Sequence, residues 1–386
     1  MDRLRLISCF LFLAGTLFSG SSCKPLPGEK VDSTDSLQKE NIVFAKGFSI
    51  AHGPGFTLLE VSNPWQGSRN TRYRYVLAAC KDSVPEHLED LPFIKTPVSK
   101  IVCLSTTQLA MINSLGANSA ITGLSGTAFV FDSLTRNRIA AGKIREVGYE
   151  QGLDLEVLLQ MKPDLILAYG VGAEITGTVS KLDDMGLQVV FDSEYLEKHP
   201  LAKTEWIRFL AVILGREKEA DSIFEGVRER YERLVSTAAG ALSKPVVMTG
   251  LPWKDSWNVP PGNSTTAAFI ADAGGVYLWN DLRGADNFSL SLEEVVASSA
   301  KASVWINAGI ARCEKDIVNT DERLKAIPAV KQHQLYNNNR RMGSGGGNDF
   351  WESGVMNPDM ILADLVAIFH PELMRGHQLN YYVKLQ

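Results

Sequence analysis

The chain has 386 residues, of which 45% are hydrophobic and 22% are charged, and its formal net charge at pH 7 is -5. This length and composition are typical of a globular protein with enough chain for two domains, each with its own core. The small negative charge excludes a broad basic surface for nucleic acid or anionic lipid. After the N-terminus, no apolar run approaches the roughly 20 residues that span a bilayer.

The N-terminus has the pattern of an export signal. Arg3 and Arg5 precede a short apolar stretch that ends at Phe18, and small residues then lead into Cys23. The apolar stretch is too short for a stable membrane span. The pattern therefore predicts a signal peptide over residues 1–22.

The small residues in front of Cys23 resemble a bacterial lipoprotein cleavage site. That resemblance implies a lipid on Cys23, a polar tether over 23–40, and a protein that is exported and anchored to a membrane, in the periplasm or at the cell surface. Gly20 departs from the pattern, because a Leu usually stands three positions before the Cys. A plain secretory signal is the alternative.

The first part of the predicted mature domain indicates β-structure. Apolar segments on both sides of Gly53-Pro54-Gly55 predict a hairpin, and a segment rich in prolines and acidic residues follows it. We assign residues 41–98 to an N-terminal β-hairpin extension and its linker. From 99 to 199, short apolar strands alternate with helices, which predicts a parallel sheet covered on both faces.

Residues 200–242 carry a helical stripe of apolar side chains that is longer than an ordinary crossover helix. We expect one long, rigid spine helix here, and α/β alternation resumes over 243–386. The two α/β regions also echo each other, since each has a helix that starts with Leu-Glu and then an apolar strand that ends at Gly. The predicted fold class is therefore α/β, with two Rossmann-like lobes joined by a single long spine helix.

At these segments the chain resembles the periplasmic binding proteins for ferric siderophores, haem and cobalamin. The resemblance covers roughly residues 41–385 and depends on the order and spacing of segments at 101–115, 121–123, 155–168, 270–275, 290–297 and 348–365. It implies the substrate-binding component of an ABC importer, which delivers a metal chelate to a permease dimer with its cytoplasmic ATPase. It also implies a monomer without catalytic activity or a resident cofactor.

In that family, one Glu on each lobe forms salt bridges with arginines of the permease. Glu156 and Glu293 hold the matching positions, so the resemblance implies that they dock the protein on its permease. Acidic residues are also favoured at helix N-termini for electrostatic reasons alone. Glu294 is the competing choice in the second lobe.

A cleft for a large chelate needs flat apolar walls and a few fixed charges, and loops at the ends of strands supply them. The aromatic and basic residues in such loops are Tyr149, Tyr169, Trp253, Trp257, Trp351, Arg283, Arg340 and Arg341. Each aromatic residue has core packing as its alternative. The glycine-rich segment at 343–349 fits either a backbone cradle for an anion or a tightly turned loop. The six His residues show no zinc-binding spacing, so we expect no metal site of the protein's own.

The arginines favour a ferric chelate, with cobalamin or haem as alternatives for the same type of importer. An exported enzyme is the alternative of a different class. It is disfavoured because Glu156 and Glu293 are predicted on separate lobes, too far apart for acid–base work on one bond. A stiff spine also implies a largely preformed cleft with modest lobe motion.

Overall fold

A computed structural model of the chain describes residues 37–149, 152–253 and 256–386. The predicted signal peptide, Cys23 and nearly all of the predicted tether lie outside these residues. Contacts divide the chain into two units, of which the second, Gln38–Gln386, contains the helices and strands of the described residues. None of the helices in the described ranges is both long enough and apolar enough to cross a membrane.

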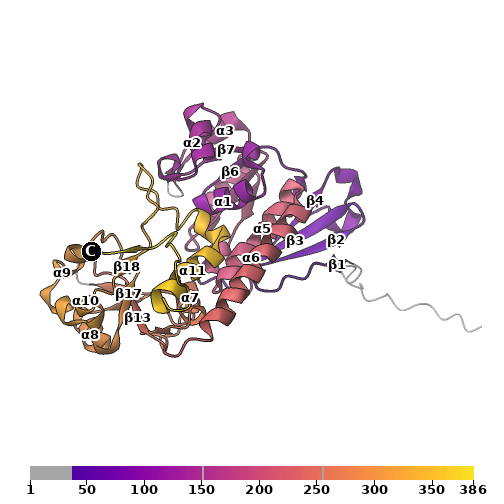
Figure 1. The fold of residues 1–386 in the computed structure, drawn as a ribbon. Coiled ribbons are helices and arrows are strands. Elements are labelled where there is room, and N and C mark those ends of the chain that lie inside the picture. Colours follow the sequence, from indigo (N-terminus) through magenta and orange to yellow (C-terminus); the bar gives the residue numbers. More distant parts are fainter. Residues whose placement is uncertain (1–36, 150–151, 254–255) are drawn as a thin grey trace, which may run out of the picture. The chain divides into compact units, whose positions relative to one another are not determined.

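The N-terminal extension is larger than the expected hairpin. It is a five-stranded sheet in chain order (Figure 1), formed by β1 (Gln38–Lys39), β2 (Phe48–Gly53), β3 (Phe56–Ser62), β4 (Arg72–Ala78) and β5 (Phe93–Lys95). The strands pair antiparallel except β4 and β5, which are parallel. The expected linker supplies the fifth strand, because its apolar Ile94 packs into the core.

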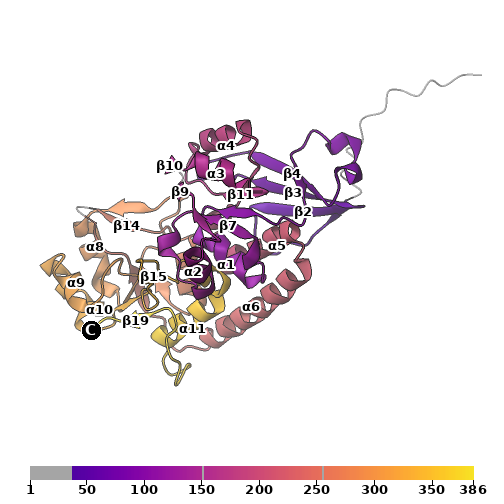
Figure 2. The same ribbon diagram turned by 90° about the horizontal axis from the view of Figure 1, so that it is seen from above.

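Two buried glutamates attach the extension to the rest of the unit. The Glu205 carboxylate accepts hydrogen bonds from the N–H groups of residues 43–45 at 2.7–2.9 Å, and Glu197 accepts from residues 46 and 47 at 2.8 and 2.9 Å. Buried charges are tolerated when their oxygens are filled in this way. The segment before β2 is thereby fixed beside the spine (Figure 2).

The first lobe contains a parallel five-stranded sheet in the order β12-β11-β6-β7-β8. Its strands are β6 (Ile101–Cys103), β7 (Ile121–Leu124), β8 (Arg145–Glu146), β11 (Leu165–Ala168) and β12 (Val189–Phe191). Its helices are α1 (Thr106–Ser114), α2 (Ser133–Ala140), α3 (Leu155–Met161) and α4 (Ile175–Asp184). The strands β6, β11 and β12 are buried along their whole length, as expected for a sheet covered on both faces.

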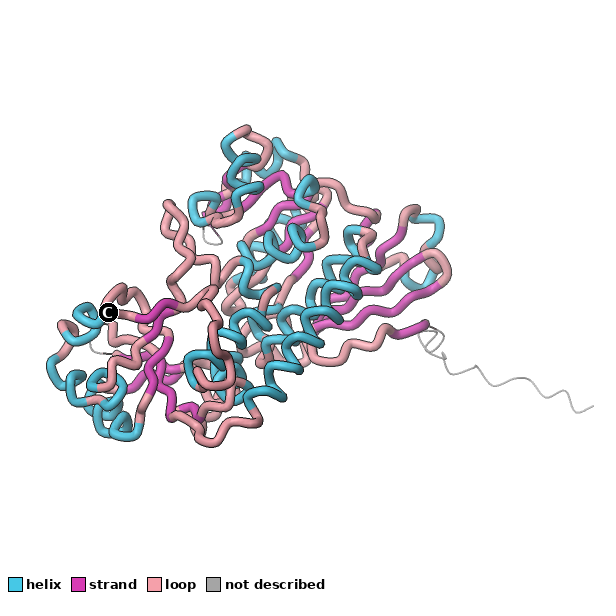
Figure 3. Tube along the Cα trace, viewed as in Figure 1, coloured by secondary structure: helices cyan, strands magenta, loops and turns pink. Residues whose placement is uncertain are grey.

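The spine differs from the expected single helix over 200–242. It consists of α5 (Pro200–Leu214) and α6 (Glu217–Ala238), which are separate helices in Figure 3. Gly215 ends α5 in a left-handed conformation with φ of 65°, and its N–H donates to the Ala211 carbonyl. Glycine adopts this conformation without a Cβ clash, so it closes the helix where the stripe of apolar residues alone predicted continuation.

The second lobe repeats the parallel pattern on a smaller scale. Its three-stranded sheet has the order β15-β13-β17, formed by Val276–Tyr277, Val246–Thr249 and Val304–Ile306. Helices α7 (Thr265–Asp272), α8 (Leu292–Ser298), α9 (Glu314–Val318), α10 (Pro328–Lys331) and α11 (Pro358–Phe369) surround it. Two short antiparallel ribbons join β14 (Trp257–Val259) to β16 (Phe288–Leu290) and β18 (Tyr336–Asn337) to β19 (Val383–Lys384).

The described residues contain two large hydrophobic cores. One joins the extension, the first lobe and α5, and the other joins the second lobe, α11 and the later turns of α6. The predicted α/β fold class with two lobes is confirmed. Since each lobe has its own core, the carboxyl ends of both sheets are available to form a site between them.

Candidate functional site

Three neighbouring cavities lie where residues of both lobes meet. We name them the outer cavity, of about 1290 Å³, the apolar cavity, of about 260 Å³, and the charged cavity, of about 310 Å³. Trp351 lines all three, Thr106 lines the outer and charged cavities, and Asn307 lines the outer and apolar cavities. The cavities therefore adjoin one another in a single cleft around the Trp351 side chain.

The N-terminus of α1 faces this cleft. Ser105 caps the helix, with its Oγ accepting from the Thr107 N–H at 3.2 Å, while Gln108 Oε1 accepts from the Leu104 and Ser105 N–H groups at 2.9 and 3.2 Å. This capping box holds the first turn in place directly after β6. The positive end of the helix dipole is thus directed at the cleft and favours a negatively charged group there.

Trp351 has the geometry of a ligand wall. Its side chain is 62% exposed, yet its ring packs edge-on against the buried Phe350 at 4.8 Å between centroids. The backbone N–H of Trp351 donates to the Asn348 carbonyl at 2.9 Å. A large aromatic ring that is fixed on one side and open on the other offers a flat apolar surface to a ligand.

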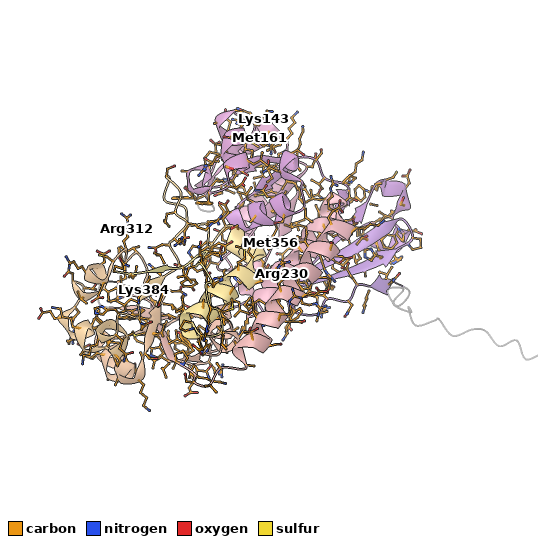
Figure 4. All side chains as sticks on the ribbon, in the orientation of Figure 1. Lys143, Met161, Arg230, Arg312, Met356 and Lys384 are labelled. Carbon is orange, nitrogen blue, oxygen red and sulfur yellow. The ribbon has the colours of Figure 1, made fainter. Side chains whose placement is uncertain are left out.

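The outer cavity combines exposed apolar side chains with two guanidinium groups. Phe129, Ile310 and Met342 line it and are 46%, 80% and 47% exposed. Arg312 and Arg340 line it as well, and Figure 4 labels Arg312 on the second lobe. Arg340 is a predicted site residue. Arg312 was missed, although the echo between the lobes places it in the loop after β17, as Tyr169 is in the loop after β11.

Two of the three predicted arginines lie elsewhere. Arg341 Nε is 2.6 Å from Asp349 Oδ2, and its guanidinium lies over the Phe131 ring at 5.2 Å and the Tyr381 ring at 5.5 Å. Arg283 donates to the Gly262 carbonyl at 2.7 Å. Neither residue lines the three cavities, because each guanidinium is used in local packing or capping.

The predicted aromatic residues lie in different environments. Trp257 is fully buried, donates its indole N–H to the Thr249 carbonyl at 2.9 Å and packs 5.4 Å from Trp305, so its ring belongs to the core of the second lobe. Trp253 and Tyr149 are 69% and 57% exposed but line none of the three cavities. Tyr169 lines the charged cavity.

The glycine-rich segment is a hairpin that reaches the first lobe. The Gly343 N–H donates to the Gly347 carbonyl at 2.7 Å. A Cβ at Gly345 would lie 1.8 Å from the Ala128 carbonyl oxygen, and one at Gly347 would lie 1.7 Å from that of Phe129. Glycine is required here for close approach between backbones, so this segment fits the tightly turned loop.

Glu352 connects the same regions of the two lobes. Its carboxylate accepts from the N–H groups of Phe131 and Asp132, both at 2.7 Å, and burial raises the pKa of this carboxyl. We call residues 343–347 together with Glu352 the interlobe clasp. Residues 343, 344, 346 and 347 of the clasp line the outer cavity.

The charged cavity contains a buried acid–base pair that was not among the predicted site residues. Glu194 and Lys203 line it, with 3.6 Å between Glu194 Oε2 and Lys203 Nζ. Asp192 lies next to Glu194, and burial, with the Glu194 carboxylate as the next cause, raises the pKa of Asp192 to about 8. The sequence signal was present, since Asp192-Ser193-Glu194 directly follow the apolar strand β12.

The predicted docking glutamates lie at the start of matching helices. Glu156 is in the first turn of α3 and accepts from Gln160 Nε2 at 3.3 Å. Glu293 is in the first turn of α8, where Arg323 donates to it at 2.7 Å. Glu294 instead accepts from the Ser291 N–H and hydroxyl at 2.7 and 2.8 Å. This capping contact occupies the Glu294 carboxylate, whereas the Glu293 side chain is 71% exposed.

Two α/β lobes joined by helices, with a cleft at the carboxyl ends of their strands, define the class of two-lobed solute-binding proteins. The model of the periplasmic binding protein family matches residues 101–340, so the chain belongs to this family. Its members are substrate-binding proteins rather than enzymes, which agrees with the predicted resemblance.

The chain is similar to an uncharacterized lipoprotein of Methanocaldococcus jannaschii, with 23% identity over 347 residues that cover 84% of this chain and 81% of the relative. A possible iron-binding periplasmic protein from Staphylococcus epidermidis has the same fold, with a TM-score of 0.56, 19% identity and coverage of 71% of this chain and 99% of that chain. The periplasmic heme-binding protein RhuT from Roseiflexus sp. RS-1 gives a TM-score of 0.55, 20% identity and coverage of 72% and 99%. At these identities the likeness to the solved structures establishes the fold.

Proposed function

We propose that this protein captures a ferric chelate of the siderophore type and delivers it to the permease of an ABC importer. The outer cavity carries this proposal, because it combines a wide apolar wall with the guanidinium groups of Arg312 and Arg340. Siderophore complexes are large, partly apolar and often anionic. Its volume of about 1290 Å³ exceeds the roughly 300–1,000 Å³ of ordinary small-molecule sites, which suits such a cargo.

The composition of the outer cavity also bears on the alternatives. The described lining of the outer cavity contains no His or Tyr, the side chains that most often bind haem iron, whereas Tyr169 and Tyr195 line the adjoining charged cavity. A chelate that brings its own iron ligands therefore suits the outer cavity. Cobalamin is the second candidate. Asn338, Asn339 and Asn348 line the same cavity, and their amides suit the amide groups at the corrin edge.

Delivery is proposed to use Glu156 and Glu293. Both stand in the first turn of a seven-residue helix, one on each lobe, and Glu293 has a side chain that is 71% exposed. Two exposed carboxylates on separate lobes suit charge-assisted pairing with arginines of a dimeric permease. Arg323 holds the Glu293 carboxylate in one position and lowers its pKa through their hydrogen bond. The export signal and a lipid on Cys23 complete the proposal, since they place the protein at the membrane that holds the permease.

Isothermal titration calorimetry of the purified full chain with a ferric hydroxamate, a ferric catecholate, haem and cobalamin tests this assignment. The proposal expects saturable binding of a ferric siderophore at micromolar or tighter affinity. Preferential binding of cobalamin would move the assignment to the second candidate. No binding of any of the four by the folded protein would contradict it.

A further inference from the structure

The charged cavity has features that capture of an anionic chelate does not use. Thr106 and Thr107 of α1 line it, Glu194 and Lys203 supply its charges, and Trp351 lines both this cavity and the outer cavity. Its volume of about 310 Å³ is suited to a small polar group rather than to a whole chelate. The side chains of this cavity therefore indicate what that group is.

The acidic side of the charged cavity has an unfilled acceptor. Glu194 is only 5% exposed, and within the described ranges no donor lies at hydrogen-bond distance from its Oε2. Lys203 Nζ, at 3.6 Å, pairs with that oxygen without a direct hydrogen bond. A buried carboxylate oxygen left in this state is costly, so a ligand with N–H donors gains from filling it.

Asp192, the second buried carboxyl near Glu194, also favours a ligand with N–H donors. It is 1% exposed, its Oδ2 also lacks a donor among the described residues, and Gln108 holds it by a side-chain hydrogen bond. Burial raises the pKa of this carboxyl to about 8, so it holds a proton more strongly than an ordinary aspartate does. A cation in the cavity would be attracted to Glu194 directly and to Asp192 through loss of that proton.

Lys203 and the N-terminus of α1 make part of the charged cavity suited to an anion. Lys203 Nζ is a full positive charge with a side chain that is 26% exposed, and the first turn of the nine-residue helix α1 adds its positive dipole end. Ser105 caps that turn, which fixes the direction of its N–H groups. A carboxylate next to Lys203 and this turn would be stabilised by both.

Aromatic rings form the remaining walls. Tyr169 and Tyr195 line the charged cavity together with Trp351, and the two tyrosine rings are 6.2 Å apart in an edge-on arrangement. Ring faces attract ammonium groups and accommodate short apolar chains. Acidic, basic and aromatic walls around one small volume are complementary to a zwitterion.

We propose that the charged cavity binds a zwitterionic α-amino-carboxylate group, with its ammonium on Glu194 and its carboxylate on Lys203 and the N-terminus of α1. This inference rests on the proposed function, because the group would be the end of a chelate whose metal-bearing part occupies the outer cavity across Trp351. The cargo is then a chelate with a free amino-acid terminus. A free amino acid offers the same chemistry, so the test separates the two sources.

The test uses tryptophan fluorescence of the purified full chain, titrated with L-leucine, N-acetyl-L-leucine and L-leucine methyl ester. Leucine does not absorb at the wavelengths used, and the two derivatives remove one charge each. We expect leucine to change the fluorescence saturably, and each derivative to bind at least about tenfold more weakly. Equal binding of a derivative, or no response to leucine at millimolar concentration, would overturn the proposal.

Two variants test the assignment to residues. Glu194→Gln and Lys203→Met should each weaken leucine binding at least about tenfold, while Glu322→Gln on the exposed surface should leave it unchanged. Circular dichroism of each variant verifies folding, and unchanged leucine affinity in both folded cavity variants would overturn the proposal.

A ferric siderophore with an amino-acid terminus, and the same compound N-acetylated, distinguish the two sources of the zwitterion. A preference for the free form shows that the group belongs to the chelate. Binding of leucine without binding of any chelate would retain the cavity assignment and contradict the proposed function. If chelates bind but leucine gives no response and the free amine is not preferred, the cavity assignment is contradicted and the proposed function is retained.

Discussion

The outer and charged cavities share Trp351 but differ in almost every other respect. The outer cavity is wide and is lined by exposed apolar side chains, with Arg312 and Arg340 as its charges. The charged cavity is small and holds a carboxylate and an ammonium group 3.6 Å apart. Affinity for a bulky cargo depends on the apolar area that is buried in the outer cavity. Discrimination between cargoes depends on the buried polar groups of the charged cavity.

The largest expected effect is at the shared residue. Trp351→Ala removes a wall from all three cavities, so it should weaken binding of the preferred chelate by about 2–4 kcal/mol, as calorimetry can measure. Trp253→Ala is the matched control, because Trp253 is also exposed but lines none of them. If both variants lose the same affinity, Trp351 is not a specific wall of the binding cavities.

The next effect concerns the interlobe clasp. Gly347→Ala places a Cβ 1.7 Å from the Phe129 carbonyl oxygen, so the hairpin must move away from the first lobe. We expect the free energy of unfolding to fall by about 1–3 kcal/mol in urea titrations. Gly177→Ala, in α4, is the control. Its new Cβ has no atom within 4 Å, so this substitution should be neutral or stabilising. If Gly347→Ala is as stable as Gly177→Ala, the interlobe clasp does not stabilise the fold.

The arginines of the outer cavity should contribute less each. Arg312→Gln and Arg340→Gln should each weaken binding of an anionic ferric chelate by about 1 kcal/mol, and the loss should shrink as salt is raised. Arg283→Gln, which removes an arginine outside the three cavities, should have no effect. Losses that do not depend on salt would point to packing rather than charge as the role of these side chains.

The charged cavity should give the smallest change in stability over any single pH step. The pKa of Asp192 rises from an ordinary 3.8 to about 8 in the folded protein, so between these values the folded state binds more protons than the unfolded state. Stability should therefore fall as pH rises through this window, by less than about 1 kcal/mol per pH unit. Asp192→Asn should flatten the dependence in thermal unfolding measured from pH 4 to 8. An unchanged slope would show that Asp192 is ionised in the fold.

The alternation of strands and helices was sufficient to predict two lobes, since buried parallel strands leave a clear apolar pattern in the sequence. From the sequence alone, Gly215 could either end a helix or be tolerated inside one long helix. The left-handed turn that decides between them depends on how α5 and α6 pack. Trp257 shows the same limit for the site. A tryptophan before a turn can face the cleft or the core, and only the fold places its indole N–H on the Thr249 carbonyl.

Residues of the site that were missed had local signals. Asp192 and Glu194 follow a buried strand, and Arg312 lies in a loop equivalent to one already chosen in the first lobe. Their roles still depend on which loops the two lobes bring together, and the distance of 3.6 Å between Glu194 and Lys203 is a property of the tertiary structure. Arg340 and Trp351 were chosen from the sequence as basic and aromatic residues in loops, and the structure places both in the lining of the outer cavity.

The most direct test of the central claim is a crystal structure of the protein with its best-bound ferric chelate, with anomalous diffraction measured at the iron edge. We predict an iron peak in the outer cavity, beside Trp351 and within reach of Arg312 and Arg340. An iron peak outside the three cavities, in a crystal where the chelate is bound at full occupancy, would contradict the account.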